Sequence, residues 1–233
     1  MVMCKTELMK LLSLAFFTLL LTLGAGAQNQ IGIFAGPQAT TARYTIKEEK
    51  QKTSMKYGFQ LGGVMKVPFD NQLFFAPTVF YSMKGYKVDF TRFAFPPDVD
   101  AKDNDVTVHT FEVAPLLQVD FSKDPSHFFI KFGPSLDVQL FGKESFHLIS
   151  TGATVNRNMK FSFGDYGYAS MNGIGQFGYE SSNGFSIFAQ YSFGIGSISN
   201  ADDGPKIYHR VFGISVGKYL NRKKIVIDTR NKE

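Results

Sequence analysis

The sequence predicts an all-β fold, an eight-stranded antiparallel up-and-down transmembrane β-barrel, and three observations predict it. Apolar residues recur at every second position in most of eight segments, which is the period of strands rather than of helices. The composition favours strands and close packing, with 25 Phe, 10 Tyr and 22 Gly among 233 residues. The connections between the segments alternate between short turns and longer polar loops, as they do in barrels that cross a membrane.

Residues 1–27 have the pattern of a signal peptide that is removed on export. Lys5 and Lys10 precede an apolar run at residues 11–23, and the small residues Gly-Ala-Gly-Ala follow it as a cleavage site. A membrane anchor would need about 20 apolar residues and no cleavage site. The one cysteine, Cys4, lies in the removed part, so the mature chain is expected to fold without disulfides.

The mature chain divides into a barrel at residues 28–220 and a basic periplasmic tail at residues 221–233. Removal of residues 1–27 leaves 206 residues with 23 basic and 19 acidic side chains, and the tail alone carries a net charge of +3. The barrel is therefore almost neutral. Nucleic-acid binding is not expected, because no basic face remains to follow phosphates.

The first four strands are expected at residues 30–44, 56–67, 73–90 and 106–121. In each of them apolar residues prevail at one alternating set of positions, and small or polar residues are more frequent at the other. The first strand contains Pro37, which a sheet tolerates near an edge or a bulge.

The last four strands are expected at residues 127–140, 166–180, 185–195 and 207–220. The first of these has the clearest alternation, because every second residue from Phe128 to Leu140 is apolar and most of the others are small or polar. The segment 166–180 contains so many glycines that its two faces cannot be assigned.

The connections predict how the barrel is oriented. Those after the second, fourth and sixth strands are short, at residues 68–71, 122–126 and 181–184. Those after the first, third, fifth and seventh are longer and more polar, at residues 47–52, 91–105, 142–164 and 199–206. Short turns are periplasmic and long loops are external in such barrels, so both chain ends are expected on the periplasmic side.

The size of the side chains predicts that the apolar faces point to lipid. Bulky apolar residues occupy one face of the strands, whereas Gly, Ser and charged residues are frequent on the other. Small residues suit a narrow lumen, while a soluble lipocalin-like barrel or a sandwich would need the bulky face inside. A Lys or Arg facing the middle of the bilayer would cost about 2 to 4 kcal/mol, and the middle of the apolar faces contains none.

The candidate site is a network of polar side chains in the lumen. An eight-stranded barrel is just wide enough to be filled by its own side chains, so a network that satisfies buried charges is expected, with a transport path or ligand site as the alternative. The inward candidates are Lys66, Lys84, Glu112, Gln118, Lys131 and Asp137. We also expect Asp120 opposite His127, as an ion pair at the periplasmic rim.

Neither a metal nor a cofactor is expected. The loop aspartates could bind calcium, but their spacing lacks the glycine and distal Glu of an EF-hand, so a solvated loop is favoured. These aspartates are Asp98, Asp100, Asp103 and Asp105. The four histidines, His109, His127, His147 and His209, lack the spacing of metal ligands.

One enzymatic alternative comes from Ser145, His147 and Glu144. Alternation places the serine and the histidine on the same face of a strand, where a lipid hydrolase would hold its nucleophile beside its base. We expect these residues to be ordinary rim residues and the protein not to be an enzyme.

Three segments resemble the PorT-like type of outer-membrane β-barrel proteins, a group of porin-family proteins. They are APTVFYSMKGYK at residues 76–87, FEVAPLL at residues 111–117 and KFGP at residues 131–134. The resemblance covers the mature barrel and implies the outer membrane of a Bacteroidota-type Gram-negative bacterium. It also implies membership of a group that includes accessory proteins of secretion and gliding machinery. The charged tail departs from barrels that end on the last aromatic residue of a strand.

The expected function is therefore structural, adhesive or secretion-accessory, exerted through the outer loops or the periplasmic tail. The expected partners are outer-membrane lipid and a periplasmic or secretion-machinery protein, which the tail would contact by adding a strand unless it is disordered. A monomer is expected. The alternatives are a narrow pore for small solutes and an outer-membrane lipid hydrolase.

Overall fold

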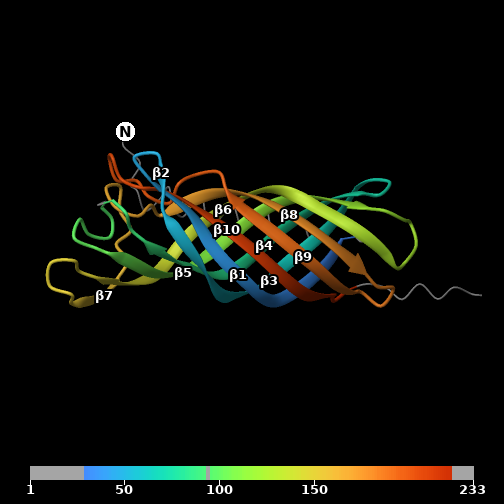
Figure 1. The fold of residues 1–233 in the computed structure, drawn as a ribbon. Helices are drawn as coiled ribbons and strands as arrows, with labels where there is room; N and C mark the ends of the chain where they lie inside the picture. Colours follow the sequence, from blue (N-terminus) through green and yellow to red (C-terminus); the bar gives the residue numbers. More distant parts are fainter. Residues whose placement is uncertain (1–28, 93–94, 222–233) are drawn as a thin grey trace, which may run out of the picture.

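The computed structural model describes residues 29–92 and 95–221, which form one antiparallel sheet that closes into a barrel (Figure 1). The strands in these residues are β1 (Gln30–Ile46), β2 (Glu49–Lys50), β3 (Lys52–Asp70), β4 (Leu73–Asp89), β5 (Asp103–Asp120), β6 (His127–His147), β7 (Thr154–Asn158), β8 (Ala169–Glu180), β9 (Phe185–Gly194) and β10 (Lys206–Tyr219). The predicted signal peptide lies outside the described residues, and so does the predicted tail except for Asn221.

The wall consists of the eight longest strands in the described part of the chain. They pair in the order β1, β3, β4, β5, β6, β8, β9 and β10, and β10 pairs back onto β1 from Gly32↔Tyr219 to Thr45↔Lys206. The two short strands lie at one end of the barrel, where β2 extends the β1–β3 connection and β7 pairs with the end of β6. The predicted eight-stranded up-and-down barrel is confirmed. No helix in the described ranges is long and apolar enough to span a membrane.

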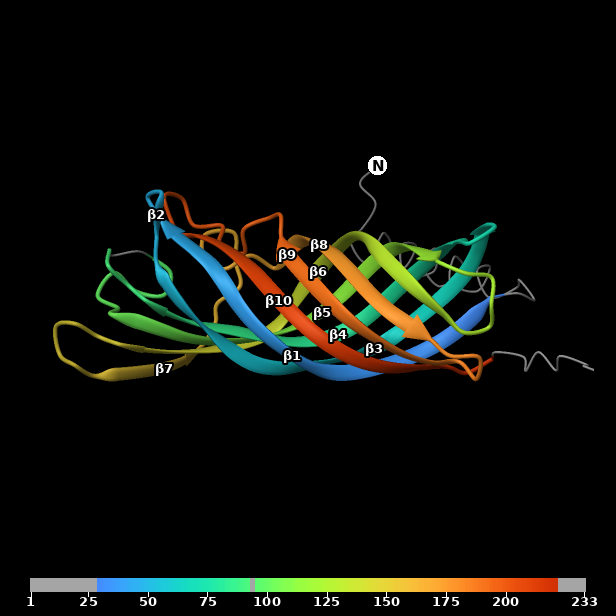
Figure 2. The same ribbon diagram turned by 45° about the vertical axis from the view of Figure 1, so that its right-hand side comes forward.

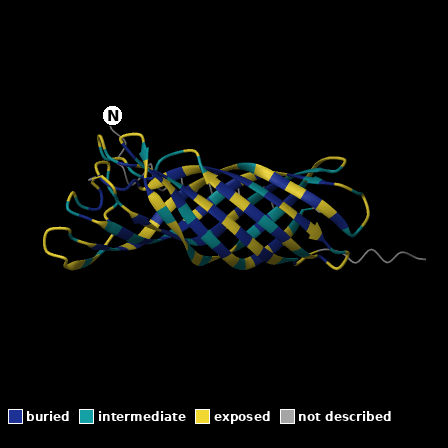
Figure 3. Ribbon diagram, in the orientation of Figure 1, coloured by how far each residue is buried: buried dark blue, intermediate teal, exposed yellow. Residues whose placement is uncertain are grey.

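Burial alternates along each strand (Figure 3). In β6, Phe128, Ile130 and Phe132 are exposed on the outer wall, whereas Lys131 and Asp137 are buried in the lumen. The same alternation assigns the faces of glycine-rich β8. Met171, Phe177 and Tyr179 point outward, and Asn172, Gln176 and Glu180 point inward.

The strands continue beyond the apolar wall at the end opposite the short turns (Figure 2). The prediction of a loop at residues 142–164 is wrong in part, because β6 runs on to His147 and β7 pairs with it. A bulge at the upper edge of the apolar wall leaves Leu140 and Phe141 both exposed, and Lys143, Ser145 and His147 then take the outward positions. This extension faces water on its outside, so it lacks the apolar alternation that identifies a lipid-facing strand.

Prolines interrupt the hydrogen-bond ladder at two places, because proline has no N–H to donate. Between β5 and β6 the pairing stops after Val113↔Leu136 and resumes at Leu117↔Phe132. The unpaired stretch between these two pairs includes Pro115 and Pro134. Between β1 and β10 the pairing skips from Ala35↔Val216 to Gln38↔Gly213, across Gly36 and Pro37. The second interruption lies in the seam that closes the barrel.

Two apolar clusters fill the lumen. The inner cluster lies toward the short turns and contains aromatic side chains of four strands, Phe34, Phe80, Phe129 and Phe188. The outer cluster lies in the extended part and includes Tyr44, Tyr86, Tyr166 and Ile207. Buried polar side chains lie between the clusters and at the end of the barrel that carries the short turns.

Gly62 allows β3 to lie close to the side chain of Phe80. A Cβ atom at Gly62 would lie 2.3 Å from Phe80 Cβ and 2.4 Å from the carbonyl oxygen of Val79, whereas a Cβ at Gly175 would meet no atom within 4 Å. We therefore expect Gly62→Ala to lower the free energy of unfolding by about 1 to 3 kcal/mol. Urea titration in detergent micelles, followed by heat-modifiable gel mobility, measures the loss. Gly175→Ala is the control, and an equal loss in both variants would contradict the steric explanation.

Candidate functional site

The centre of the lumen contains a buried cluster of one lysine and two carboxylates. Lys84 Nζ lies 2.7 Å from Glu112 Oε1 and 2.6 Å from Asp137 Oδ2. The three side chains are at most 1% exposed. Register explains how they meet, because Glu112 lies directly opposite Asp137 on β5 and β6, and Lys84 reaches them from the neighbouring strand β4. The two negative charges thus share one positive charge, in a space closed at each end by an apolar cluster.

A second charged cluster, which we call the turn-end cluster, closes the end of the barrel that carries the short turns. Lys66 Nζ lies 2.6 Å from Asp120 Oδ2 and 3.0 Å from Glu180 Oε2. His127 Nε2 lies 3.0 Å from Asp120 Oδ2 and 3.6 Å from Glu180 Oε2. Gln118 donates a further hydrogen bond of 2.5 Å to Asp120 Oδ1. The cluster draws on β3, β5, β6 and β8, so it links strands on different sides of the ring.

The expected partnership of Asp120 and His127 needs one correction. The residue directly opposite Asp120 is Phe129, not His127, and the two side chains meet diagonally across the strand pair. Glu180 and Lys66 also belong to this cluster, which the sequence does not indicate. Neither residue is near Asp120 in the sequence, and the glycines of β8 leave the direction of Glu180 open.

Asp120, His127 and Glu180 are the group of described residues whose side-chain atoms are close enough to share a metal ion, all within 4.8 Å of one another. Lys66 lies between the two carboxylates, so its ammonium already supplies the positive charge that such an ion would bring. The residues fit an ion-pair cluster better than a metal centre.

The six predicted lumen residues are all buried, but they do not form one network. Lys84, Glu112 and Asp137 belong to the central cluster, and Lys66 and Gln118 belong to the turn-end cluster. Lys131 is different, because no ion pair joins it to another described residue. Its Nζ lies 4.9 Å from the centre of the Phe129 ring and 5.9 Å from that of Phe188, which are cation–π contacts. The hollow beside it has a volume of about 10 Å³, which leaves room for about one water molecule.

A chain of glutamines, which the sequence does not predict, crosses the lumen. Gln176 donates to Gln190 at 2.8 Å, Gln190 donates to Gln60 at 3.1 Å, and Gln60 donates to Ser215 at 3.0 Å. These residues belong to β8, β9, β3 and β10. Contacts between strands across a ring depend on the geometry of the barrel, which alternation within a single strand does not predict.

The outer end is closed by ordered connections, which we call the outer cap: the described residues of segments 90–102, 148–153, 159–168 and 195–205. Backbone hydrogen bonds tie these segments together, with Ile149 N donating to Asp100 O at 2.8 Å and Gly167 N donating to Ile198 O at 2.6 Å. Glu144 is buried beneath the cap. It accepts hydrogen bonds of 2.7 Å from Arg157 and 2.8 Å from Tyr166.

The hydrolase candidate is not assembled in the way a nucleophile and its base require. Ser145 and His147 share the outer face of β6, as predicted, but no hydrogen bond between them is found in the described ranges. His147 Nδ1 lies 2.9 Å from Asp103, and Glu144 points into the lumen on the opposite face.

The loop aspartates do not converge on one point. Asp98 accepts a hydrogen bond from Asp100 N, Asp100 accepts one from Ser150, and Asp103 contacts His147. Asp105 binds Lys56 and Lys87, the latter at 3.1 Å, on the water-facing extension. Burial alone would raise the pKa of Asp105, but the two lysines outweigh that effect and hold the pKa below its ordinary value.

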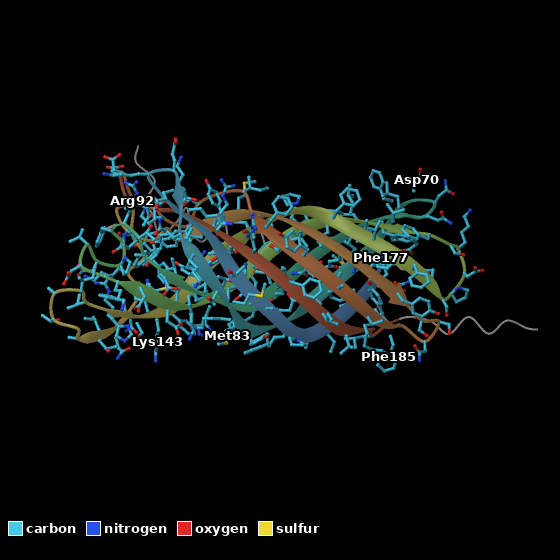
Figure 4. The ribbon with its side chains drawn as sticks, viewed as in Figure 1. Asp70, Met83, Arg92, Lys143, Phe177 and Phe185 are labelled. Atoms are coloured by element: carbon cyan, nitrogen blue, oxygen red, sulfur yellow. The ribbon has the colours of Figure 1, made fainter. Side chains whose placement is uncertain are left out.

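The side chains also divide the outer wall into zones (Figure 4). Phe177 and Phe185 lie toward the short turns, whereas Lys143 and Arg92 lie toward the outer cap. A family model for the outer membrane protein β-barrel domain matches residues 26–200 of the chain. The chain belongs to this family. Its apolar wall therefore faces the lipid of an outer membrane.

Two solved outer-membrane barrels are similar to this chain over most of its length, at low sequence identity. OprG of Pseudomonas aeruginosa is 12% identical, with a TM-score of 0.47, over 82% of this chain and 96% of that one. Ail of Yersinia pestis, solved in complex with the heparin analogue sucrose octasulfate, is 14% identical, with a TM-score of 0.42, over 82% of this chain and 99% of that one. A search of curated protein sequences finds no match.

Proposed function

We propose that this chain is a closed, non-enzymatic barrel that presents the outer cap at the cell surface and acts through it, in a structural, adhesive or secretion-accessory role. The observation that carries the proposal is the contrast between a filled lumen and an ordered outer end with exposed apolar side chains. Phe163 is 88% exposed, Val99 63% and Ile149 53%. Apolar groups held on an ordered surface in water favour contact with another macromolecule.

The filled lumen argues against the pore alternative. Two apolar clusters and two ion-pair clusters follow one another along the axis, joined by the glutamine chain. In planar lipid bilayers we expect the purified barrel to give no stable single-channel steps. Regular steps that vanish on heat denaturation would contradict the closed barrel and favour the pore.

A contact role also agrees with the resemblance to PorT-like proteins, which implies secretion or gliding accessories. Such a role needs a partner at the outer cap or at the periplasmic tail. The tail is outside the described residues, apart from Asn221, so the outer cap supports the proposal.

Site-specific photo-crosslinking in intact cells tests the contact. A photoreactive residue in place of Val99, Ile149 or Phe163 is expected to give a discrete adduct. Phe69, which is 73% exposed beside a short turn at the other end, is the matched control and is expected to give no such adduct. A partner from the same envelope would indicate a secretion accessory, and one from another cell would indicate an adhesin. Absence of any adduct at the three outer positions, with the barrel present and folded, would overturn the proposal.

A further inference from the structure

Two arginines lie close together on the outer wall, where the apolar surface ends. Arg43 of β1 is directly opposite Tyr208 of β10, and Arg210 of β10 is directly opposite Thr41 of β1. The arginines are therefore diagonal neighbours on one face, a spacing that long side chains easily bridge. The guanidinium carbon of Arg43 lies 5.9 Å from the centre of the Tyr208 ring, a contact that orients it over the wall.

A hollow of about 480 Å³ lies between these arginines and the apolar wall. Its lining includes Arg43, Arg210 and Tyr208 at the polar side, and Tyr191, Phe193 and Ile195 at the apolar side. None of its lining residues is acidic. Neither arginine forms an ion pair with another residue of the described ranges. The hollow therefore combines two unneutralised guanidinium groups with exposed aromatic surface.

The position of the arginines along the strands places them at the level of lipid headgroups. Below Arg210 on β10, the outward residues Phe212, Ile214 and Val216 are exposed and apolar. On β1 the outward residues from Ile31 to Ala39 are likewise apolar, and Thr41 and Arg43 follow them. The arginines point outward at the upper edge of this apolar belt, on the side of the outer cap. With the outer cap at the cell surface, as proposed above, the apolar belt lies among the acyl chains and this edge contacts the headgroups of the outer leaflet.

We propose that Arg43 and Arg210 bind a phosphate group of an outer-leaflet glycolipid, whose acyl chains lie against Tyr191, Phe193 and Phe212. Guanidinium groups bind phosphate with paired, charge-assisted hydrogen bonds, and two of them neutralise a phosphate monoester. Tyr208 lies opposite Arg43, where its hydroxyl and ring suit the sugar that carries the phosphate. The occupant is a lipid rather than a free anion because Tyr191, Phe193 and Ile195, which are exposed on the apolar wall, line one side of the hollow.

Lys87 is a cation on the outer wall whose charge is already balanced by an acidic partner. Lys87 on β4 is exposed, with 58% of its side chain accessible, yet it pairs with Asp105 at 3.1 Å. Lys87 thus offers a matched control, a cation on the water-facing part of the outer wall that has an acidic partner.

Native mass spectrometry of the full barrel in uncharged detergent micelles tests the proposal, with phosphorylated lipid A as the probe. Each of Arg43→Gln and Arg210→Gln is expected to weaken binding about fivefold, and the double variant about 25-fold. Lys87→Gln is expected to leave binding unchanged. Lipid A from which the phosphates have been removed is expected to bind the unsubstituted chain as weakly as phosphorylated lipid A binds the double variant.

Three results would overturn the proposal. The first is unchanged binding by the double variant, after gel mobility has shown that it is folded. The second is equal binding of phosphorylated and dephosphorylated lipid A. The third is complete displacement of the lipid by millimolar inorganic phosphate, which would identify a site for the free anion instead.

Discussion

Lys84→Met is expected to lower the free energy of unfolding of the barrel by about 3 to 5 kcal/mol, the cost of removing one partner of a buried ion pair. Lys84 supplies the positive charge between Glu112 and Asp137, and the three side chains are at most 1% exposed. Methionine has a similar length but leaves two carboxylates facing each other without a cation. Urea unfolding in lipid vesicles, followed by gel mobility, measures the loss.

Lys131→Met is the matched control for this prediction. Lys131 is also buried in the lumen, 4% exposed, but it has no ion pair within the described residues. Its replacement by an apolar side chain is expected to leave stability unchanged or to increase it. The triple variant Lys84→Met, Glu112→Gln, Asp137→Asn removes both signs of charge and is expected to recover most of the loss. Equal losses in the two lysine variants would show that volume, rather than charge pairing, determines stability here.

Lys66→Met is expected to cost about 3 to 5 kcal/mol as well, and also to create a zinc site. The variant would leave His127 Nε2 at 3.0 Å from Asp120 Oδ2 and 3.6 Å from Glu180 Oε2. Zinc binds nitrogen and oxygen ligands at about 2.0 to 2.2 Å in a tetrahedral arrangement, in which ligand atoms lie about 3.3 Å apart. Zinc at about 100 times its Kd would restore about 2.7 kcal/mol, measured by the same unfolding titration.

Two controls make the zinc prediction specific. Zinc is expected to leave the unsubstituted chain unaffected, because the ammonium of Lys66 occupies the space between the two carboxylates. In the Lys66→Met background, His127→Gln is expected to abolish the zinc effect. Stabilisation by zinc that persists without His127 would place the metal elsewhere.

Alternation alone predicted an inward direction for Lys84, Glu112 and Asp137, because a charge on the other face would meet hydrocarbon. In the structure these three side chains are buried. Alternation could not predict which of them meet, since that depends on register. The register of β5 and β6 places Glu112 opposite Asp137 and Asp120 opposite Phe129. The predicted register, with Asp120 opposite His127, differs from this by two residues.

The sequence is less informative about strand segments that face water instead of lipid on the outside of the barrel, and about segments rich in glycine. The outer part of β6 has water on its outside and the barrel on its inside, so Lys143, Ser145 and His147 resemble a polar loop. In β8, glycines at 173, 175 and 178 fall on both faces, and without side chains they give no direction. The glutamine chain joins residues far apart in the sequence, and glutamine side chains are compatible with either a solvated loop or a lumen.

The seam between β1 and β10 limits the order in which this protein can be made. One edge of β1 pairs with β3 and the other with β10, the last strand of the wall. The second edge of β1 therefore stays unpaired until nearly the whole chain has been delivered to the membrane. An edge with unpaired N–H and C=O groups costs several kcal/mol per group in hydrocarbon. Closure therefore has to accompany insertion. A chain that stops before Lys206 would lack the strand that pairs from Thr45 to Gly32, and it would present two open edges to the machinery that inserts it.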